Sequence, residues 1–155
     1  MTAGRHVYID YAHNAESLEN ILEQIKQIHQ KKLIVVFGCG GNRDKTKRPK
    51  MGAIASKIAD QVILTNDNPR FEDPRVIVEE IKSGIAKENL QKVTTLMDRK
   101  TAIYHALHSS QPGDCVLVAG KGHETYQIIG EEQFKFSDFE CIHQYFDEFF
   151  PSKNL

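Results

Sequence analysis

The chain has 155 residues, of which 40% are hydrophobic and 26% charged, a composition that fits one globular domain with a buried core. Twenty Lys and Arg stand against 21 Asp and Glu, so the net charge of −1 gives no reason to expect nucleic acid or an anionic membrane as the partner. No apolar run approaches the ~20 residues of a membrane-spanning helix, and the N-terminus lacks the order of a signal peptide, so we expect a cytoplasmic monomer.

Strand-like and helix-like segments alternate along most of the sequence. The β-branched and aromatic run at 6–12 predicts a strand, and the unbroken apolar run at 32–38 is typical of a strand buried on both faces of a parallel sheet. The expected elements, in chain order, are strand 6–12, helix 14–28, strand 32–38, helix 51–59, strand 61–65, a helix from 74, strand 92–97, helix 99–110, strand 115–120, a hairpin over 125–136 and a helix over 137–150.

Capping residues and apolar stripes support the helices. Pro74 suits the first position of a helix with Asp73 as its N-cap, and Ser137 suits the N-cap of the last helix. The side chains expected to face the core are Leu18, Ile21, Leu22, Ile25 and Ile28 in the first helix, Val76, Ile77, Ile81 and Ile85 in the third, and Phe139, Ile142, Phe146 and Phe149 in the last.

This order of elements predicts an α/β, Rossmann-like, three-layer domain. We expect a mostly parallel sheet of about six strands with helices on both faces, and an antiparallel C-terminal edge. Ligands of such sheets gather beyond the carboxyl ends of the strands. The chemically distinctive segments all follow predicted strands, and we expect them to line one rim: DYAHN at 10–14, GCGGNRDK at 38–45, DNPR at 67–70, DR at 98–99 and GKGHE at 120–124.

The glycine loop at 38–41 could turn backbone NH groups toward an anion, because glycine tolerates the φ values this requires. It matches neither GxxxxGK[ST] nor GxGxxG, so the sequence contains no complete site for a nucleoside triphosphate. A solvated turn is the alternative. The basic run that follows, without an aromatic platform for nucleic acid, favours a local phosphate or carboxylate site: Arg43, Lys45, Lys47, Arg48 and Lys50.

The segment DYAHN places Asp10 at the end of a strand, where a carboxylate can accept hydrogen bonds from ribose hydroxyls. Asn14 is equally well explained as the N-cap of the next helix, and His13 as either a ligand contact or a structural side chain. The seven histidines show no HxxxH spacing. The three cysteines contain no CxxC pair, so we expect reduced thiols and neither a disulfide framework nor a metal site.

The segments DNPR and GKGHE carry the strongest signal. Arg70 offers a planar fork of donors that suits a carboxylate, and Glu124 offers an acceptor for an ammonium. The carbonyl of Gly120 could accept from an amine, with Asn68 nearby in DNPR. Together these groups predict a receptor for a ligand that carries both NH₃⁺ and COO⁻. The alternative is that Arg70 forms an ordinary surface ion pair with Glu72 or Asp73.

Four segments, in this order, closely resemble the C-terminal domain of the Mur ligase family: DYAHN, VFGCGGNRDKTKRPKMGAIA, LTNDNPRFEDP and VLVAGKGHETYQIIG. The resemblance covers Tyr8 to about Phe149 and is strongest to the members that add meso-diaminopimelate to UDP-MurNAc-L-Ala-D-Glu in peptidoglycan synthesis. It implies that residues 1–155 form an amino-acid-binding domain. The central ATPase domain and the N-terminal UDP-binding domain of the family would belong to a longer parent chain.

Carried over residue by residue, the resemblance implies two sets of contacts. The set that holds diaminopimelate is Arg43, Asn68, Arg70, Gly120 and Glu124, with Asp67 and Pro69 shaping the loop. The set that faces the nucleotide is Asp10, His13 and Asn14, and Lys45 is a further candidate contact to an anion. No residue is assigned a catalytic or metal-binding role.

The family's chemistry implies an ATP- and Mg²⁺-dependent ligase, in which the D-glutamate carboxylate becomes an acyl phosphate that the amine attacks. This lobe would position the amino acid and close over ATP, and alone it would be inactive. Two alternatives stay open. One is a lysine-adding member of the same family, and the other is a non-catalytic α/β module that binds an anion or a nucleotide.

Overall fold

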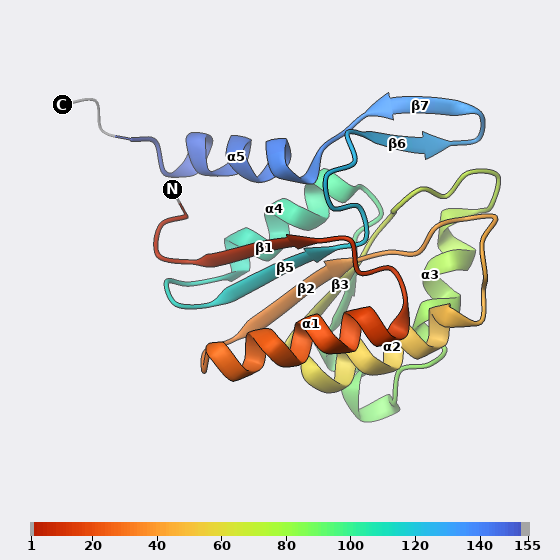
Figure 1. Ribbon diagram of the computed structural model, residues 1–155, viewed down its shortest axis with the longest axis horizontal. Helices are drawn as coiled ribbons and strands as arrows, with labels where there is room; N and C mark the ends of the chain where they lie inside the picture. The colour runs from red at the N-terminus through yellow and green to blue at the C-terminus, as the bar shows by residue number, and fades with distance from the viewer. Residues whose placement is uncertain (1, 153–155) are drawn as a thin grey trace.

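The computed structural model describes residues 2–152, and its core is a five-stranded, all-parallel sheet in the order β1-β5-β2-β3-β4 (Figure 1). The elements are β1 His6–Asp10, α1 Ala15–Ile28, β2 Leu33–Phe37, α2 Lys47–Ile58, β3 Gln61–Leu64, α3 Pro74–Lys82, the 3₁₀ helix η1 Lys87–Lys92, β4 Val93–Thr95, α4 Arg99–Ser109, β5 Cys115–Ala119, β6 Tyr126–Ile129, β7 Glu132–Lys135 and α5 Asp138–Phe149.

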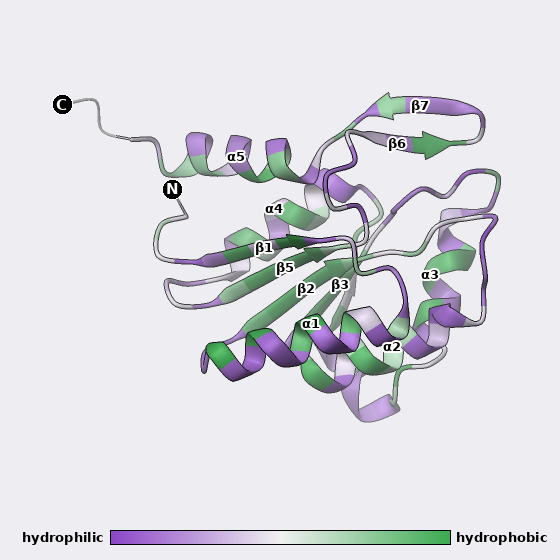
Figure 2. Ribbon diagram, in the orientation of Figure 1, coloured by the Kyte–Doolittle hydropathy of each residue, from purple (hydrophilic) through white to green (hydrophobic). Residues whose placement is uncertain are grey.

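Helices cover both faces of the sheet, which confirms the three-layer α/β fold. One layer of core side chains joins the sheet to α1, α2 and α3, and the other joins it to α4 and α5. The central strands β2 and β5 are buried along their whole length, as their continuous apolar runs predicted, and Figure 2 shows both as uniformly hydrophobic beneath mixed helices. Within residues 2–152, no helix is long and apolar enough to cross a membrane.

The antiparallel pair differs from the prediction. The strands β6 and β7 form a separate two-stranded sheet instead of an edge of the main one. Every residue of β7 is exposed, and only the two middle residues of β6, within the described chain, are half-buried. Instead β6 pairs with the segment after β3, through a bridge between Arg70 and Ile129. The hairpin is therefore a support for the DNPR segment.

The predicted N-caps are confirmed. Asn14, Asp73 and Ser137 each accept a hydrogen bond from a backbone NH in the first turn of α1, α3 and α5. Helix α2 begins at Lys47, four residues before the predicted start at 51, because the basic run joins its first turn.

Four residues predicted to face the core are exposed, namely Ile28, Val76, Phe139 and Phe149. In α5 the buried face consists of Asp138, Cys141, Ile142, Tyr145 and Phe146, at the i, i+3, i+4, i+7, i+8 spacing of a helix face. The first residue of this buried face is Asp138, which is polar. A prediction based on apolar residues alone therefore chose its neighbour Phe139 instead.

The reason for a buried carboxylate at that place is Arg99, in the first turn of α4. Both side chains are fully buried and meet in a two-pronged ion pair, with Nε to Oδ1 at 2.7 Å and Nη2 to Oδ2 at 2.8 Å. Arg99 also donates to the carbonyl of Asn66, beyond β3, at 2.9 Å and to that of Ala119, at the end of β5, at 3.2 Å. One guanidinium thus joins two helices to two strand ends.

We expect Asp138→Ala to lower the free energy of unfolding of the chain by about 3 to 5 kcal/mol, because it leaves a buried guanidinium without its counter-charge. Urea unfolding followed by circular dichroism measures the change. The matched control is Asp147→Ala on the exposed face of α5, expected within about 0.5 kcal/mol of the parent. Equal effects of the two substitutions would contradict this role for the pair.

Candidate functional site

A cleft of about 340 Å³ lies at the carboxyl ends of the strands, where the loops after β1, β2, β3 and β5 meet. Seven predicted site residues line it: His13, Arg43, Asp67, Asn68, Arg70, Gly120 and Glu124. Gly40 of the predicted glycine loop and Lys47 of the predicted basic run line it as well, and so does Tyr11, to which the sequence assigned no role. The predicted residues Asp10, Asn14, Lys45 and Pro69 are not part of its lining.

The glycine loop and the DNPR segment are pressed together at the cleft. The NH of Gly41 donates to the carbonyl of Asn68 at 2.8 Å, and a Cβ on Gly41 would overlap the carbonyl of Pro69. A Cβ on Gly40 would meet Nη1 of Arg70 at 3.0 Å. Gly40 and Gly41 therefore allow the backbone of the glycine loop to lie directly against the DNPR segment. Pro69 contributes to this contact and does not line the cleft.

Arg48 fixes the glycine loop from below and is not a free cation. Its side chain is fully buried and donates to both oxygens of Glu72, to Glu80 and to the carbonyl of Gly40. These hydrogen bonds from Arg48 lower the pKa of Glu72 to about 2. Within this network Arg48 organises the loop.

Of the predicted basic run, only Arg43 and Lys47 reach the cleft. Lys47 donates from Nζ to the carbonyl of His13 at 2.8 Å, which ties the loop after β1 to α2. Lys45 instead lies 3.4 Å from Glu72, on the exposed side of the Arg48 network. The structure gives Lys45 a surface ion pair, away from the cleft.

The hairpin holds the backbone of Arg70, and the side chain makes one hydrogen bond within residues 2–152. Its NH donates to the carbonyl of Ile128 at 3.1 Å, and its carbonyl accepts from the NH of Gly130 at 2.7 Å. Its φ of 52° lies in the left-handed region. The side chain donates from Nη1 to the carbonyl of Gly41 at 3.0 Å.

The surface ion pair considered for Arg70 does not form. Glu72 is bound by Arg48, and Asp73 caps α3 and lies against Arg75. Among residues 2–152, no carboxylate lies within ion-pair distance of Arg70. The cleft therefore contains a guanidinium that has no internal counter-charge.

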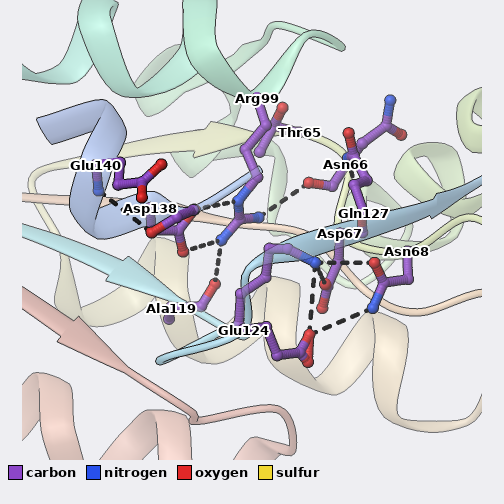
Figure 3. Close-up of polar contacts among 12 residues, drawn as sticks. Thr65, Asn66, Asp67, Asn68, Arg99, Ala119, Glu124, Gln127, Asp138 and Glu140 are labelled. Carbon is purple, nitrogen blue, oxygen red and sulfur yellow. Dashed lines mark hydrogen bonds and ion pairs between the residues drawn. The ribbon is translucent and has the colours of Figure 1, made fainter. Parts of the chain in front are cut away.

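Asp67, Asn68 and Glu124 converge on one point at the base of the cleft (Figure 3). The group between them is the buried ammonium of Lys121, whose Nζ donates to Asn68 Oδ1 at 2.8 Å and lies 3.4 Å from Asp67 Oδ1 and 3.5 Å from Glu124 Oε1. Lys121 was not among the predicted site residues, although it lies inside the GKGHE segment. Its position between two glycines was the available signal.

The loop after β5 approaches the cleft with two glycines at positive φ, 111° at Gly120 and 54° at Gly122. A Cβ on Gly122 would collide with the ring of Tyr11. The loop after β5 therefore lies directly against Tyr11, an aromatic residue of the cleft lining from the loop after β1. Gly120 donates its NH to the carbonyl of Asp10 at 2.9 Å.

Of the three residues predicted to face the nucleotide, one lines the cleft and two have local structural roles. His13 lies in the cleft lining, with Nδ1 2.8 Å from the carbonyl of Tyr11. Asp10 accepts from the NH of Ala12 at 2.8 Å and so stabilises the turn after β1, while Asn14 caps α1. Both have the local role that short polar side chains take at strand and helix ends.

The cleft lining contains charges of both signs, with Arg43, Lys47 and Arg70 positive and Asp67 and Glu124 negative. Arg43 and Arg70 both lie beside Gly40, whereas Asp67 and Glu124 both lie beside the ammonium of Lys121. Such an arrangement suits a small zwitterion. In the part of the chain that the structure describes, no three His, Cys, Asp or Glu side chains form a group that could hold a metal ion. The three cysteines are unpaired and buried, and burial raises the pKa of the Cys39 thiol to about 12.

Comparison with known proteins matches residues 1–122 to the family described as Mur ligase, glutamate ligase domain. A UDP-N-acetylmuramoyl-L-alanyl-D-glutamate--2,6-diaminopimelate ligase of Rickettsia prowazekii (strain Madrid E) is 47% identical over 153 residues, which cover 97% of this chain and 31% of that protein. The protein of the same description from Synechococcus elongatus is 54% identical over 134 residues, covering 86% of this chain and 27% of that protein. The chain thus spans about a third of the length of these relatives.

A solved structure with the same description superposes with a TM-score of 0.88 at 40% identity, over 94% of this chain and 30% of that one. A murein peptide ligase of Psychrobacter arcticus has a TM-score of 0.65 at 16% identity, over 99% of this chain and 29% of that one, and supports the fold alone.

The low pKa of Glu72 makes stability depend on pH. Since the folded-state pKa of about 2 lies below the ordinary value of 4.5, the contribution of Glu72 is complete above pH 4.5 and is lost as the pH falls toward 2. We expect the parent chain to exceed Glu72→Gln in free energy of unfolding at neutral pH, and the difference to shrink as the pH is lowered through this window. Urea unfolding at several pH values measures it.

The control for this titration is Glu79→Gln, since the side chain of Glu79 is 72% exposed and forms an ion pair with Lys82 on the surface. Its difference from the parent should stay small at every pH. A gap between parent and Glu72→Gln that does not change with pH would show that the Arg48 network does not depend on the charge of Glu72.

Proposed function

The chain belongs to the Mur ligase family, and from this premise we propose that it is the amino-acid-binding, C-terminal lobe of an ATP-dependent ligase. The ligase would add meso-diaminopimelate to UDP-MurNAc-L-Ala-D-Glu in peptidoglycan synthesis. The relatives at 47% and 54% identity carry that activity in their descriptions, which supports the assignment. The observation that carries it is a cleft guanidinium, Arg70, that has no internal carboxylate partner within residues 2–152.

Arg70 is the residue we propose to select the amino acid. Diaminopimelate differs from lysine by one carboxylate on the distal carbon, and a guanidinium fork binds a carboxylate through two parallel hydrogen bonds. Lysine in the same place would leave the guanidinium unpaired, which is the kind of mismatch that gives strong discrimination. Arg43 lies beside Gly40, as Arg70 does, and would add a second cation.

The acceptors near Lys121 would bind the amine end of the distal centre. Glu124 and Asp67 provide carboxylate oxygens, and the carbonyl of Gly120 provides a further acceptor. This division, with cations for COO⁻ and acceptors for NH₃⁺, would orient the amino acid so that its other amine points out of the cleft. The lobe would then contribute to the reaction by proximity and by excluding water when it closes.

ATP and Mg²⁺ would bind mainly on parts of a longer parent protein. The sequence contains no GxxxxGK[ST] segment, and the chain spans about a third of the length of its relatives. When bound, ATP would activate the D-glutamate carboxylate as an acyl phosphate. The candidate contacts from this lobe are His13, which lies in the cleft lining, and Lys47 beside it.

We expect Arg70→Ala in the full-length protein to reduce kcat/KM for diaminopimelate by roughly 30-fold or more, since truncating one partner of a hydrogen-bonded charge pair costs about 2 to 5 kcal/mol. Activity with lysine should fall much less, so the preference for diaminopimelate should narrow. Product formation with each amino acid, measured separately and in competition, provides the readout. Arg70→Lys keeps the charge but loses the planar pair of donors. Its kcat/KM for diaminopimelate should lie between those of the parent and Arg70→Ala.

Arg75→Ala is the matched control, because Arg75 is an exposed arginine that pairs with Asp73 outside the cleft. It should leave kcat/KM for both amino acids within about twofold of the parent. A full-length protein that prefers lysine would support the lysine-adding alternative. An unchanged preference in Arg70→Ala would remove Arg70 from the selection of substrate.

We also expect the isolated 155-residue chain to fold and to form no product from ATP, diaminopimelate and the UDP-linked dipeptide. Chemical activation of the D-glutamate carboxylate needs a triphosphate site that this sequence does not contain. Product analysis by mass spectrometry, with the full-length protein as positive control, tests this. Turnover by the isolated chain would contradict it, and tight binding of an unrelated nucleotide would favour the non-catalytic module.

A further inference from the structure

Lys121 is a fully buried lysine directly behind the cleft. Its side chain has 0% exposure, and its ammonium is surrounded by oxygens of Asp67, Asn68 and Glu124. Lysine is almost never fully buried unless it is paired, because removing an ammonium from water is costly. Lys121 is not part of the cleft lining, so it would act on a ligand only through the residues that it contacts.

We propose that Lys121 is a positioning residue that sets which cleft groups donate and which accept hydrogen bonds. The proposal rests on the function proposed above and adds a specificity-determining residue to it. Lys121 would fix the side-chain amide of Asn68 as a donor to the ligand carboxylate. It would also hold Asp67 and Glu124 close together, so that the two carboxylates and the ammonium between them present one net negative charge toward the cleft.

The orientation of the Asn68 side-chain amide follows from the two groups that donate hydrogen bonds to its oxygen. Its Oδ1 accepts from Lys121 Nζ at 2.8 Å and from the NH of Ile128 at 3.0 Å. A flipped amide would place its NH₂ against both of these donors, so the observed orientation is strongly favoured. Nδ2 then lies 3.4 Å from Glu124 Oε1. Its second proton is available to a ligand, and the acceptor that suits it beside Arg70 is a carboxylate.

The two carboxylates depend on the same ammonium. The side chains of Asp67 and Glu124 are only 10% and 24% exposed, and without a cation between them both would repel each other in a poorly solvated place. The ammonium of Lys121 lies between the two carboxylates and offsets this repulsion. In the described part of the chain, Oε2 of Glu124 takes part in no hydrogen bond or ion pair, so it is available to the ammonium of the ligand.

The hairpin extends this arrangement. Gln127 donates from Nε2 to the carbonyl of Asp67 at 2.8 Å, and the NH of Ile128 contacts Asn68 as described. Lys121 and β6 therefore grip the DNPR segment from two sides. Arg70 lies in the same segment, so these contacts also determine where its side chain points.

The test uses the full-length protein and the substitution Lys121→Met, which keeps the length of the side chain and removes the charge. We expect the KM for diaminopimelate to rise at least tenfold. The KM values for ATP and for the UDP-linked dipeptide should stay within about twofold, since the proposed function places neither of them on Lys121 or the residues that it contacts. Lys87→Met, at an exposed lysine in η1, is the matched control and should leave all three KM values unchanged. An unchanged KM for diaminopimelate, or an equal rise in all three, overturns the proposal.

A double-mutant cycle with Asn68→Ala asks whether Lys121 acts through Asn68. If it does, Asn68→Ala should raise the KM for diaminopimelate much less in the Lys121→Met background than in the parent. Independent, multiplicative effects of the two substitutions would overturn the proposal. Lys121→Arg keeps a cation in the same place, so its KM for diaminopimelate should lie between those of the parent and Lys121→Met. A KM as high as that of Lys121→Met would contradict a role for the positive charge.

A measurement on the unsubstituted 155-residue chain needs no variant to fold. In ¹⁵N-labelled protein the ammonium protons of a buried, hydrogen-bonded lysine exchange slowly, so we expect a Lys121 Nζ signal with nuclear Overhauser contacts to the side-chain amide of Asn68. Rapid exchange of this ammonium with water would overturn the proposal. Failure of the parent enzyme to use diaminopimelate would instead refute the proposed function, which keeps the two failures distinct.

Discussion

The buried ion pair of Arg99 and Asp138 is the interaction on which the cleft depends. Arg99 binds the carbonyl of Asn66, after which the DNPR segment begins, and that of Ala119, after which the GKGHE segment begins. The two segments that form the base of the cleft therefore leave the sheet from points fixed by one side chain. Burying a guanidinium carries a large desolvation penalty, which is offset here because Nε and both Nη atoms are hydrogen-bonded. The pair also fixes the start of α5, so the helix layer and the cleft share one anchor.

The cations near the cleft fall into two groups with different work. Arg48, Arg99 and Lys121 are fully buried, and each is bound by carboxylates of the chain itself. Arg43 and Arg70 lie in the cleft lining without such partners in residues 2–152. The first group holds backbone carbonyls and side-chain oxygens in place, and the second leaves donors unsatisfied for a ligand. Because the frame satisfies its own charges, its groups do not compete with a ligand for the free ones.

How much of this the sequence predicts depends on whether a feature is local. The alternation of strands and helices, the N-caps at Asn14, Asp73 and Ser137, and the gathering of the DNPR and GKGHE segments at one rim all follow from local patterns plus the rule for parallel sheets. The buried cations do not, since a sequence cannot distinguish a lysine in a loop at the surface from one enclosed by oxygens. Phe139 was assigned to the core for the same reason, because the place belongs to Asp138 only once Arg99 lies opposite. Likewise the hairpin was predicted at the edge of the main sheet. The residue that β6 actually pairs with is Arg70, and the sequence around Arg70 shows no strand pattern.

The backbone at Arg70 argues that its side chain, and not its conformation, is what this position uses. A left-handed backbone costs an ordinary L-residue roughly 1 to 2 kcal/mol relative to the right-handed region, whereas glycine or asparagine adopts it readily. Here the conformation is imposed by hydrogen bonds to Ile128 and Gly130 of the hairpin. A turn alone would be more stable with glycine in this place. The strain is therefore tolerated together with a guanidinium directed into the cleft, and the hairpin that imposes it is the element that determines where the guanidinium points.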